Sequence, residues 1–487
     1  MTRMPTTLVW FRSDLRIEDH PALATAVRGG GAVVPVFIWS PQEEGDWPAG
    51  AASRWWLHRS LAALADSLER RGSRLVIRRG PGLAALRALI RETGAVAVHW
   101  SRQYEPAVRE RDRAIESALR ADGVRVETHP GSLCYEPERV LNEQGRPFQV
   151  FTAYWRACLR LDEPAEPVPA PRRIRAPACR LESLPIESLG LEPRVDWAVG
   201  LRATWQPGEH GARRRLRDFL TSSLEGYAEE RDRPDHAGTS RLSPHLHFGE
   251  LSARRIWHEV RARQAGGLRP EASAAADAYL RELGWREFAH HLLHHFPQTT
   301  HEPLKAQYWD FPWDENPEVL EAWRRGRTGY PIVDAGMREL WSTGWMHNRV
   351  RMIVASFLVK HLLIDWRCGA AWFWDTLVDA DLANNTLGWQ WVAGCGADAA
   401  PYFRIFNPVL QGRKFDPQGD YVRRWVPELG SLSDTHLHAP WEAPPTELRA
   451  AGIRLGRDYP NPIVNHAEAR QRALAALHGL RGGRRGA

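Results

Sequence analysis

The sequence predicts an α/β domain with a doubly wound parallel sheet, followed by an all-helical domain. Short, β-branched apolar runs alternate with helical patterns as far as residue 132, and helical periodicity dominates from residue 206 to residue 487. Strands that alternate with helices along a chain form parallel sheets covered by helices on both faces. Residues 133–205 are irregular and rich in proline, especially over 163–171, and are expected to form an interdomain linker.

Five apolar runs in the first domain have the length and composition of buried strands. They are Thr7–Phe11, Ala32–Trp39, Arg74–Arg78, Ala95–Trp100 and Val124–Thr128. The clearest helical patterns between them are Ser53–Arg71 and Glu105–Ala121. Because no GxGxxG turn follows any of these runs, we expect no dinucleotide in this domain.

The second domain is expected to be helical almost throughout, with no internal repeat. Its clearest periodic segments are Gly211–Ser222, Ser252–Ala265, Ala272–His295, Asn316–Arg325 and Met346–Ile364. The last 22 residues, HAEARQRALAALHGLRGGRRGA, predict one more helix that ends in a short basic stretch.

The composition is that of a globular protein outside the membrane. Of 487 residues, 43% are hydrophobic and 25% charged. No run approaches the roughly 18 apolar residues of a membrane span, and the first residues lack the apolar core of a secretory signal. We therefore expect a cytoplasmic protein. The odd count of five cysteines, with no CxxC pair, suits a reducing compartment and argues against a structural zinc or a four-cysteine iron–sulfur cluster.

Charge and aromatic content favour nucleic acid as a partner, but weakly. The net charge is +6, and only three of the 65 basic residues are lysines. Arginine suits bidentate phosphate contact, although a GC-rich genome produces the same bias. The 23 tryptophans indicate stacking or redox use beyond the filling of a core.

The first chemical motif is GTSRLSPHLHFGEL, residues 238–251. Hydroxyl side chains, an arginine and the start of a helix together suit a pyrophosphate group. The alternative is an ordinary helix N-cap followed by proline.

The second motif, AYLRELGWREFAHHLLHHFP at residues 278–297, is strongly helical. Glu282 and Trp285 are three residues apart and share a helix face, so they could hydrogen-bond and stack a base. The alternative is an exposed Glu282–Arg286 pair beside a core tryptophan. The four histidines of the motif also permit a metal site, but no separate third ligand accompanies them.

Two further motifs suit the wall of a ligand cavity. One, residues 328–367, brings Trp345, Asn348, Arg349, Arg351 and Met352 within about two turns; a solvated helix face is the alternative. The other, LVDADLANNTLGWQWVAGCGADAAPYFRIFNP at residues 377–408, crowds two aspartates and two asparagines ahead of two tryptophans, and metal binding by paired aspartates is the competing use.

The complete set of motifs resembles the photolyase/cryptochrome family. The resemblance is carried by WFRSDLRIEDHPAL, GTSRLSPHLHFGE, ELGWREF, RTGYPIVDAGMRELWSTGWMHNR and the DADL…GWQW…RIFNP block, in family order across essentially the whole chain. It implies an N-terminal α/β domain, a helical domain that holds FAD, and light-driven repair of DNA. The working flavin would be the anionic FADH⁻, which a nearby Arg351 would stabilise.

The resemblance also implies roles for individual residues. Those that would surround the FAD are Tyr227, Thr239, Ser240, Arg241, Leu242, Ser243, Trp345, Asn348, Arg351, Asp379, Asp381 and Asn385. Those that would line the pocket for a flipped-out pyrimidine dimer or contact DNA are Arg231, Glu282, Trp285, Asn348, Arg349, Met352 and Trp391. Three tryptophans, Trp389, Trp366 and Trp313, match the electron relay of the family. No metal ligand is implied.

Within the family, the resemblance favours repair of cyclobutane pyrimidine dimers in double-stranded DNA. The segments PQEEGDWPAGAASRWWL and WFWDTLVDADL look close to plant cryptochromes, so a blue-light photoreceptor without repair activity is the rival. Plant cryptochromes have an aspartate where Asn385 stands, lack the Glu282/Trp285 pair and carry a long signalling extension that is not expected here. A flavin-bearing regulatory DNA-binding protein is a further alternative.

Other members of the family are disfavoured at single positions. Enzymes that act on (6-4) photoproducts have histidines where Asn348 and Met352 stand, and the single-strand-preferring cryptochromes lack Trp391. The resemblance therefore points to the bacterial branch often called class III, acting as a monomer. Relatives in this branch use methenyltetrahydrofolate as an antenna, which could lie near Glu43, Trp47 and Tyr104, whereas other members of the family use a deazaflavin or no antenna. The polar contacts that the common folate-binding bacterial enzymes make after their QYE motif fall here on Ala107 and Val108, so a different binding mode would be needed.

Overall fold

The structure is a computed structural model that describes residues 5–399 and 403–482. Contacts divide the chain into two compact units. Unit 1 comprises Met1–Glu225, Ser240–Pro297 and Val378–Ala383, and unit 2 comprises Gly226–Thr239, Gln298–Leu377 and Asn384–Ala487. The domain boundaries expected at residues 132 and 205 stay a prediction. The basic end expected after residue 482 lies outside the described residues.

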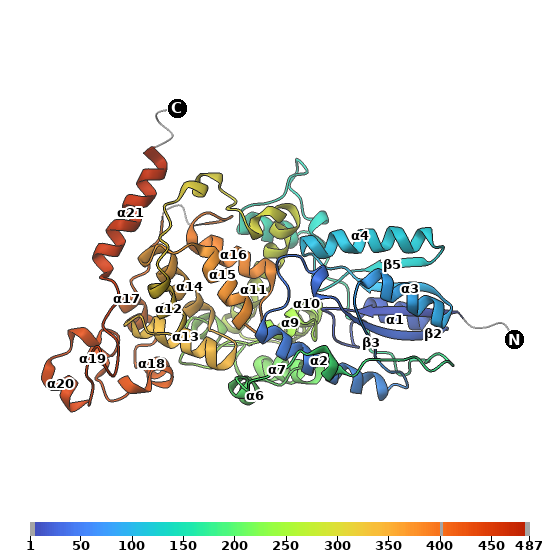
Figure 1. Cartoon of the computed structure of the whole chain (residues 1–487), viewed down its shortest axis with the longest axis horizontal. Helices are drawn as coiled ribbons and strands as arrows, with labels where there is room; N and C mark the ends of the chain where they lie inside the picture. The colour runs from blue at the N-terminus through green and yellow to red at the C-terminus, as the bar shows by residue number, and fades with distance from the viewer. Residues whose placement is uncertain (1–4, 400–402, 483–487) are drawn as a thin grey trace. The chain divides into compact units, whose positions relative to one another are not determined.

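Unit 1 contains a parallel five-stranded sheet, as predicted (Figure 1). Its strand order is β3-β2-β1-β4-β5, and every neighbouring pair is parallel. The strands are β1 Thr6–Phe11, β2 Ala32–Trp39, β3 Val76–Arg79, β4 Ala95–Ser101 and β5 Arg125–His129. β1 and β2 are buried at every position, as expected for central strands covered on both faces.

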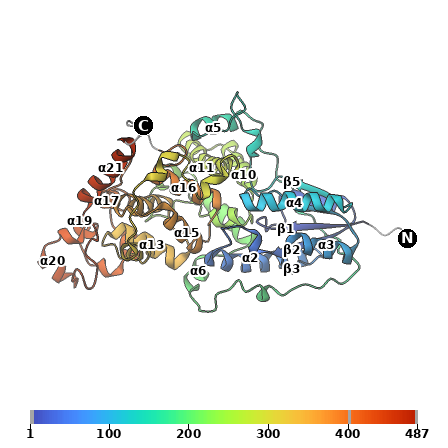
Figure 2. The same cartoon turned by 45° about the horizontal axis from the view of Figure 1, so that its top comes forward.

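Helices cover both faces of this sheet, which confirms the doubly wound prediction (Figure 2). On one face, Trp10 and Trp100 pack edge to face at 5.7 Å between ring centroids, in a core shared with α3 (Gly82–Thr93) and α4 (Pro106–Ala121). Alternate residues point the other way, and there the ring of Phe11 lies 4.6 Å from that of His20, the N-cap of α1 (Pro21–Arg28).

The helical part of unit 1 is built around α11 (Pro270–His295), a helix of 26 residues. Its Gly284 allows close packing, because a Cβ there would lie 2.6 Å from the indole of Trp155. The buried Glu287 accepts hydrogen bonds from the backbone N–H groups of Cys134 and Tyr135 at 2.9 and 3.0 Å. Burial raises the pKa of Glu287 to about 7, although Arg286 and these hydrogen bonds oppose the shift. The carboxyl group therefore ties the segment after the sheet to α11.

Of the other helices of unit 1, α2 Ala51–Glu69, α7 Glu209–Ser222 and α10 Ala253–Ala265 lie within two residues of their predicted bounds. In contrast, α5 Phe151–Cys158 and α6 Val199–Thr204 fall within residues 133–205, which were expected to be irregular. The short helix α9 Ser243–His247 lies in the first chemical motif. Among the described residues, none of the helices is both long and apolar enough to cross a membrane.

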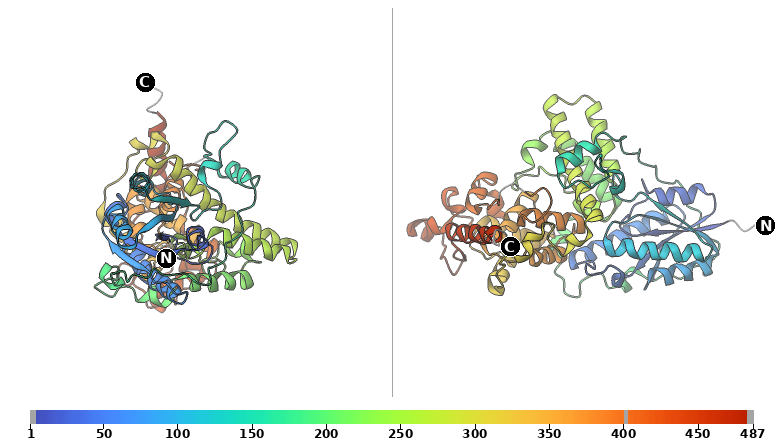
Figure 3. Two further views of the ribbon diagram at one scale, coloured as in Figure 1. Left: turned by 90° about the vertical axis from the view of Figure 1, so that its right-hand side faces the viewer. Right: turned by 90° about the horizontal axis from the view of Figure 1, so that it is seen from above.

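Unit 2 is helical, as predicted (Figure 3). Its helices are α8 Tyr227–Glu230, α12 Pro317–Arg324, α13 Pro331–Thr343, α14 Asn348–Ser356, α15 Trp366–Thr376, α17 Pro408–Phe415, α18 Asp420–Trp425, α19 Asp434–Leu437, α20 Pro445–Ala450 and α21 His466–Gly482, with most of α16 (Leu382–Ala393). The buried Trp323 anchors α12, since its Nε1 donates to the carbonyl oxygen of Val354 at 3.0 Å.

One helix differs from its prediction. The segment Met346–Ile364 is not a single α-helix: α14 ends at Ser356, and Phe357–His361 form a π-helical turn. After this turn, Leu363 adopts a positive φ of 54°, and Ile364 pairs with Asp314 in an isolated bridge. The widened turn carries two fully buried polar side chains, Lys360 and His361.

Candidate functional site

The segment Ser240–Ser243 of unit 1 combines backbone strain with positive charge. Arg241 has a φ of +50°, a left-handed conformation that is uncommon for residues other than glycine. Its guanidinium lies 5.0 Å from the ring of Trp205, and that of Arg215 lies 5.3 Å from the same ring. Burial and then the charge of Arg241 lower the pKa of Arg215. Two cations on one indole form a surface suited to an anion.

The structure joins this segment to the DADL motif. The Ser243 hydroxyl donates to Oδ2 of Asp379 at 2.6 Å, and Leu242 between the hydroxyls is buried. Ser240 forms a hydrogen bond with Tyr279. This bond acts to lower the pKa of Tyr279, but burial has the larger effect and raises it to about 12. Two hydroxyl groups of the motif therefore contact side chains, and neither caps the short helix that begins at Ser243.

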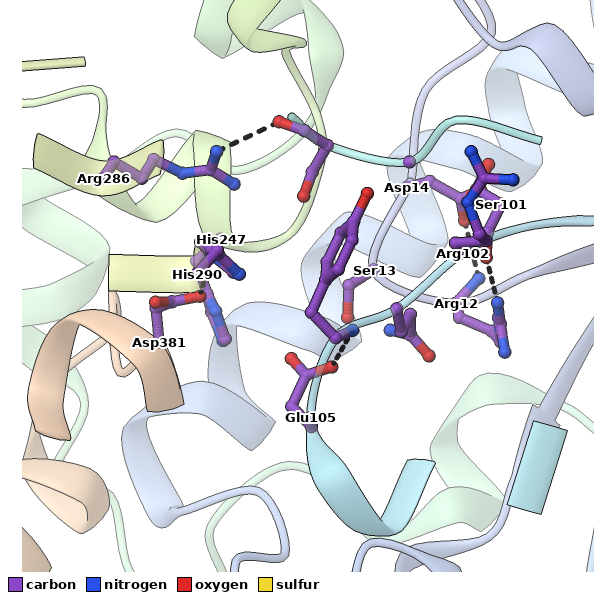
Figure 4. Close-up of a pocket in the computed structure, with 14 residues that line it drawn as sticks. Arg12, Ser13, Asp14, Ser101, Arg102, Glu105, His247, Arg286, His290 and Asp381 are labelled. Atoms are coloured by element: carbon purple, nitrogen blue, oxygen red, sulfur yellow. Dashed lines mark hydrogen bonds and ion pairs between the residues drawn. The ribbon is translucent and has the colours of Figure 1, made fainter. Parts of the chain in front are cut away.

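Asp381 is a buried carboxylate in an electropositive setting. His290 of α11 places Nε2 3.2 Å from Oδ2 of Asp381. Burial acts to raise the pKa of Asp381, but the charge and hydrogen bond of His290, with Arg286 and His247, lower it well below 3.8. Burial lowers the pKa of His247 despite the attraction of Asp381. Figure 4 shows Asp381, His247 and His290 gathered at one side of a cavity.

This cavity, of about 20 Å³, lies within unit 1 and is lined mainly by polar residues. Its other side is formed by Arg12 and Asp14, which follow β1, and by residues 101–105, which begin at the last residue of β4. Arg12 pairs with Asp112 and donates to the carbonyl oxygen of Ser101. The cavity has room for a water molecule but not for an aromatic chromophore.

The histidines of α11 and the paired aspartates have individual partners. His291 Nε2 accepts from the backbone N–H of Phe148 at 3.1 Å, His294 lies 3.4 Å from Glu138, and His295 contacts the carbonyl oxygen of Pro137 at 3.2 Å. His290 pairs with Asp381, and Ser243 donates a hydrogen bond to Asp379. These side chains therefore stabilise unit 1, and no metal-like grouping among them occurs in the described residues.

Unit 2 holds the other residues predicted to surround the flavin. Tyr227 is buried, with the guanidinium of Arg231 5.6 Å from its ring. Arg351 lies 5.9 Å from the ring of the buried Trp345 and donates from Nε to the carbonyl oxygen of Met346 at 2.7 Å. Asn385 donates from Nδ2 to the carbonyl oxygen of Ala370 at 3.0 Å. Thr239 is half-buried, and Asn348 is exposed at the first turn of α14.

Arg349, predicted to contact the lesion or its backbone, has a carboxylate partner inside unit 2. Its Nε and a terminal nitrogen reach the two oxygens of Asp232 at 3.2 and 2.7 Å. The same guanidinium lies 4.6 Å from the ring of Phe415 and 3.8 Å from the sulfur of Met352. A bidentate pair of this kind fixes the orientation of the guanidinium.

Glu282 and Trp285 are both half-buried on the same stretch of α11. The Trp285 ring stacks on that of Phe151 with 3.8 Å between centroids and 10° between planes. This contact holds the indole in one orientation. Trp391, in unit 2, is oriented by a hydrogen bond from Nε1 to the carbonyl oxygen of Asp398 at 3.1 Å.

The three predicted relay tryptophans differ in exposure. Trp389 and Trp366 are each 2% exposed, whereas Trp313 is half-buried and packs on Phe311 at 4.3 Å. Trp389 fits against α15 because a Cβ at Gly369 would lie 2.1 Å from its indole. The gradient from buried to exposed rings agrees with the order implied by the resemblance, although the relay itself stays a prediction.

Several supporting residues were not predicted from the sequence. Trp205, Phe151 and Asp232 lie outside the matched motifs, and each acts on a predicted residue through one long-range contact. Nothing in the local pattern of the chain indicates which residues these three contact. The only available signal is that Phe151 and Trp205 are large aromatic residues within the expected linker, and such residues are usually buried.

The donor set fits a flavin dinucleotide. Hydroxyl groups and a guanidinium in Thr239–Ser243 suit a pyrophosphate, and the buried carboxylates of Asp379 and Asp381 can accept from hydroxyl or N–H groups. The family model for the FAD binding domain of DNA photolyase matches residues 279–479, and that for DNA photolyase matches residues 7–172. Fold and site thus define an FAD-binding protein.

Known proteins resemble the chain over its whole length. The deoxyribodipyrimidine photo-lyase of Agrobacterium fabrum is 50% identical over 96% of this chain and 97% of its own. Cryptochrome-2 of Arabidopsis thaliana is 44% identical over 97% of this chain and 78% of its own. The crystal structure of a bacterial class III photolyase from Agrobacterium tumefaciens matches with a TM-score of 0.95 and 48% identity, over 99% of each chain. The protein belongs to the photolyase/cryptochrome family.

Proposed function

We propose that this protein is a deoxyribodipyrimidine photo-lyase, a carbon–carbon lyase that repairs cyclobutane pyrimidine dimers in DNA under light. The observation that carries the proposal is the match to the Agrobacterium fabrum photo-lyase at 50% identity over 96% of the chain. The likeness to a class III photolyase structure, with a TM-score of 0.95, supports the same conclusion.

The geometry of α11 suits the substrate. A flipped-out base needs a flat apolar surface and a hydrogen-bonding group, and unpairing costs least at a lesion. Trp285, fixed by its stack on Phe151, supplies the surface, and Glu282 lies one helical turn before it. In unit 2, Trp391 supplies a second oriented indole, and Asn348 and Met352 are accessible on α14.

The flavin, when bound, supplies the electron that light transfers to the dimer. We propose that Ser240, Arg241 and Ser243 of unit 1 bind its pyrophosphate region, with Thr239 and Tyr227 of unit 2. Asp379 and Asp381 would accept hydrogen bonds from it as carboxylates; for Asp381, the lowered pKa keeps the group ionised at neutral pH. Arg351 would stabilise negative charge on the reduced ring, which favours FADH⁻ as the working form.

Asn385 favours repair over the photoreceptor alternative. Its amide donates to the carbonyl oxygen of Ala370, so its oxygen points away from that contact and remains an acceptor. An amide cannot deliver a proton to a neighbouring group, whereas an aspartic acid can. This difference separates the residue here from the aspartate expected in plant cryptochromes.

We also propose that methenyltetrahydrofolate binds to unit 1 as an antenna, near Glu43, Trp47 and Tyr104. Tyr104 is buried and donates to Glu136 at 3.1 Å, which fixes its ring. Oε2 of Glu43 accepts from the backbone N–H of Gly82 at 2.9 Å. The small cavity beside Tyr104 cannot hold the pterin, so the folate would lie against the surface around Trp47.

The partner would be double-stranded DNA that contains a pyrimidine dimer. We propose that the protein acts on it as a monomer in the bacterial cytoplasm. Arg231 and Arg349 would contact the phosphates or the lesion, and affinity should fall with salt.

The test is loss of thymine dimers from a duplex under blue light, measured for the wild type and for Glu282→Ala with flavin content checked in both. The wild type should repair. Glu282→Ala should keep its FAD but repair less, because a hydrogen bond that strengthens as charge develops on the dimer is lost. Glu271→Ala, an exposed position on the same helix, is the matched control and should repair normally.

A wild-type protein that carries reduced FAD and repairs no dimers would overturn the proposal and favour the photoreceptor. If Glu282→Ala instead loses its FAD, the carboxylate belongs to the flavin site. An absorption spectrum of the freshly purified protein tests the antenna separately, through a near-ultraviolet band beyond that of the flavin.

A further inference from the structure

Two histidines and a glutamate meet on the last two strands of the sheet, and none of the three is assigned above to the flavin, the substrate or the electron relay. His99 lies on β4, and Glu127 and His129 lie on the edge strand β5. His99 Nδ1 is 3.2 Å from His129 Nε2 and 3.9 Å from Oε2 of Glu127, and the three atoms all lie within 4.8 Å of one another. It is the one grouping of this kind among the described residues.

The register of the sheet places these side chains on one face. His99 pairs directly with Glu127 in the parallel ladder, so their side chains project to the same side. His129 follows Glu127 by two residues and therefore projects to that side too. Val98, Trp100 and Val126 point to the opposite face, into the core with α3 and α4. Strand alternation, and not loop flexibility, thus brings the three groups together.

The spacing matches tetrahedral coordination. Two nitrogens bound to one Zn²⁺ at about 2.0–2.1 Å, with a tetrahedral angle between them, lie about 3.3–3.4 Å apart. The two imidazole nitrogens are 3.2 Å apart, and the rings stack at 5.2 Å with 22° between planes. Oε2 of Glu127, 3.9 Å from His99 Nδ1, would need only a small side-chain movement to reach the same ion. Glu127 is partly exposed on the edge strand, so that movement is open to it.

One neighbouring cation bears on the charge of the site. The positive charge of Arg125 would repel a bound cation. However, Arg125 pairs with Oε1 of Glu127 at 3.2 Å, and Oε2 of Glu127 faces the histidines.

The ring of His99 also carries a buried nitrogen beyond this contact. His99 is 2% exposed, and its Nε2 has no hydrogen-bond partner in the structure. A hydrogen-bonded pair of neutral histidines would explain the 3.2 Å contact alone. It would not explain the adjacent carboxylate within reach of both rings.

We propose that His99, Glu127 and His129 form a site for one divalent cation of borderline softness, with Zn²⁺ the physiological ion. Two imidazoles and a carboxylate are ligands that Zn²⁺ accepts readily, and water would complete the coordination. Because the ligands come from β4 and β5, the ion would clamp the edge strand to the sheet. The site is independent of the proposed repair activity.

The test is binding of Zn²⁺ to the FAD-loaded protein, produced without a histidine tag. One equivalent should remain after dialysis, and Co²⁺ in its place should give visible absorption of the tetrahedral kind. His129→Gln and Glu127→Gln, both at partly exposed positions, should weaken binding by more than the roughly 10- to 100-fold that loss of a supporting partner costs. Zn²⁺ should raise the Tm of the wild type but not of these variants.

His294→Gln is the matched control, since it removes one member of the histidine cluster on α11 and should leave binding unchanged. Binding that His294→Gln abolishes and His129→Gln spares would overturn the proposal and assign the metal to α11. Absence of one-to-one binding at millimolar Zn²⁺ would also overturn it. Dimer repair should be unchanged in His129→Gln, which separates this proposal from the proposed function.

Discussion

The hydroxyl of Ser243 donates a 2.6 Å hydrogen bond to the carboxylate of Asp379, 136 residues further along the chain. The bond joins two of the motifs assigned to the flavin and orients Asp379 within unit 1. A hydrogen bond to a charged acceptor contributes about 1.5–3 kcal/mol. Its loss should therefore affect both stability and the orientation of the carboxylate.

We expect Ser243→Ala to lose part of its FAD during purification, because Asp379 is no longer held. The flavin-to-protein absorbance ratio and Tm measure this. Ser243→Thr, which keeps the hydroxyl, should bind FAD better than the alanine variant. Ser222→Ala, where the hydroxyl bonds only a helix carbonyl, is the control. Unchanged flavin content and Tm in Ser243→Ala would contradict the assignment.

The second prediction concerns the pair of His290 and Asp381. The pKa of Asp381 in the folded protein lies below its ordinary value of 3.8, chiefly because His290 outweighs the effect of burial. A carboxylate of this kind stabilises the fold above its unfolded pKa, and the stabilisation is lost as the pH falls through the folded pKa. His290→Leu should cost about 3–5 kcal/mol near pH 6, since it leaves a buried charge with less compensation.

Denaturant unfolding at several pH values tests this prediction. The difference in free energy of unfolding between wild type and His290→Leu should shrink as the pH falls through the acid range, because Asp381 of the folded variant, without His290, is protonated at a higher pH than Asp381 of the wild type. His236→Leu, at an exposed pair with Glu230, should show only a small difference. A difference that stays constant over the acid range would mean that His290 acts through packing alone.

Local patterns predicted the sheet and most of the helices because each has its own periodicity. All five strands occur within two residues of the expected bounds, in a parallel order that follows from the alternation of strands and helices. The break of the predicted helix at Ser356 had no such signal, since FLVKHLL continues the apolar pattern. A π-helical turn there depends on tertiary packing around Lys360, which one sequence does not display.

The site was predicted by residue type, but not by its supporting contacts. Asp379, Asp381 and Ser243 were identified from motifs, whereas their pairing with one another and with His290 required the fold. The cluster of His99 and His129 was missed because its members lie 30 residues apart and only the register of β4 with β5 brings them together. Long-range pairing of this kind carries no sequence periodicity.

Asp232 is predicted to restrain binding to DNA through Arg349. Its two oxygens hold the guanidinium at 3.2 and 2.7 Å, which neutralises a charge proposed to contact DNA. Asp232→Asn should strengthen binding to undamaged duplex, because it frees Arg349 to contact one more phosphate. Binding should then release about one more counterion, which makes the slope of log K against log salt steeper by about 0.9. Arg349→Ala should reverse the gain. An unchanged slope in Asp232→Asn would show that Arg349 does not reach the phosphates.

Trp313 is predicted to be the terminal member of the electron relay. Trp313→Phe should slow photoreduction of the oxidised flavin severalfold, because phenylalanine is much harder to oxidise. Repair by protein reduced chemically beforehand should persist. The control is Trp309→Phe, since Trp309 is 52% exposed and lies nearby in the chain. If only the Trp309 variant slows, the relay ends there. If neither variant slows, a second route through neighbours such as Trp341 and Trp374 carries the electron.

The last prediction concerns Lys360, a buried cation in the π-helical turn of unit 2. Its ammonium lies 3.1 Å from the centroid of the Phe403 ring, and burial lowers its pKa from 10.5 to about 7, against a small opposing effect of Cys395. Because the folded pKa lies below the unfolded one, the unfolded chain binds more protons between these values. This lysine therefore destabilises the fold fully below pH 7, and the penalty disappears as the pH rises toward 10.5.

Lys360→Met should accordingly be more stable than the wild type at pH 7, by about 1–3 kcal/mol once the lost cation–π contact is allowed for. The gain should shrink between pH 7 and pH 10, which urea unfolding of both proteins across that range measures. Lys305→Met, at an exposed lysine of the same unit, should show no such trend. A Lys360→Met variant that is less stable at pH 7, by an amount independent of pH, would show that the ammonium is fully compensated and that its contact with Phe403 stabilises the turn.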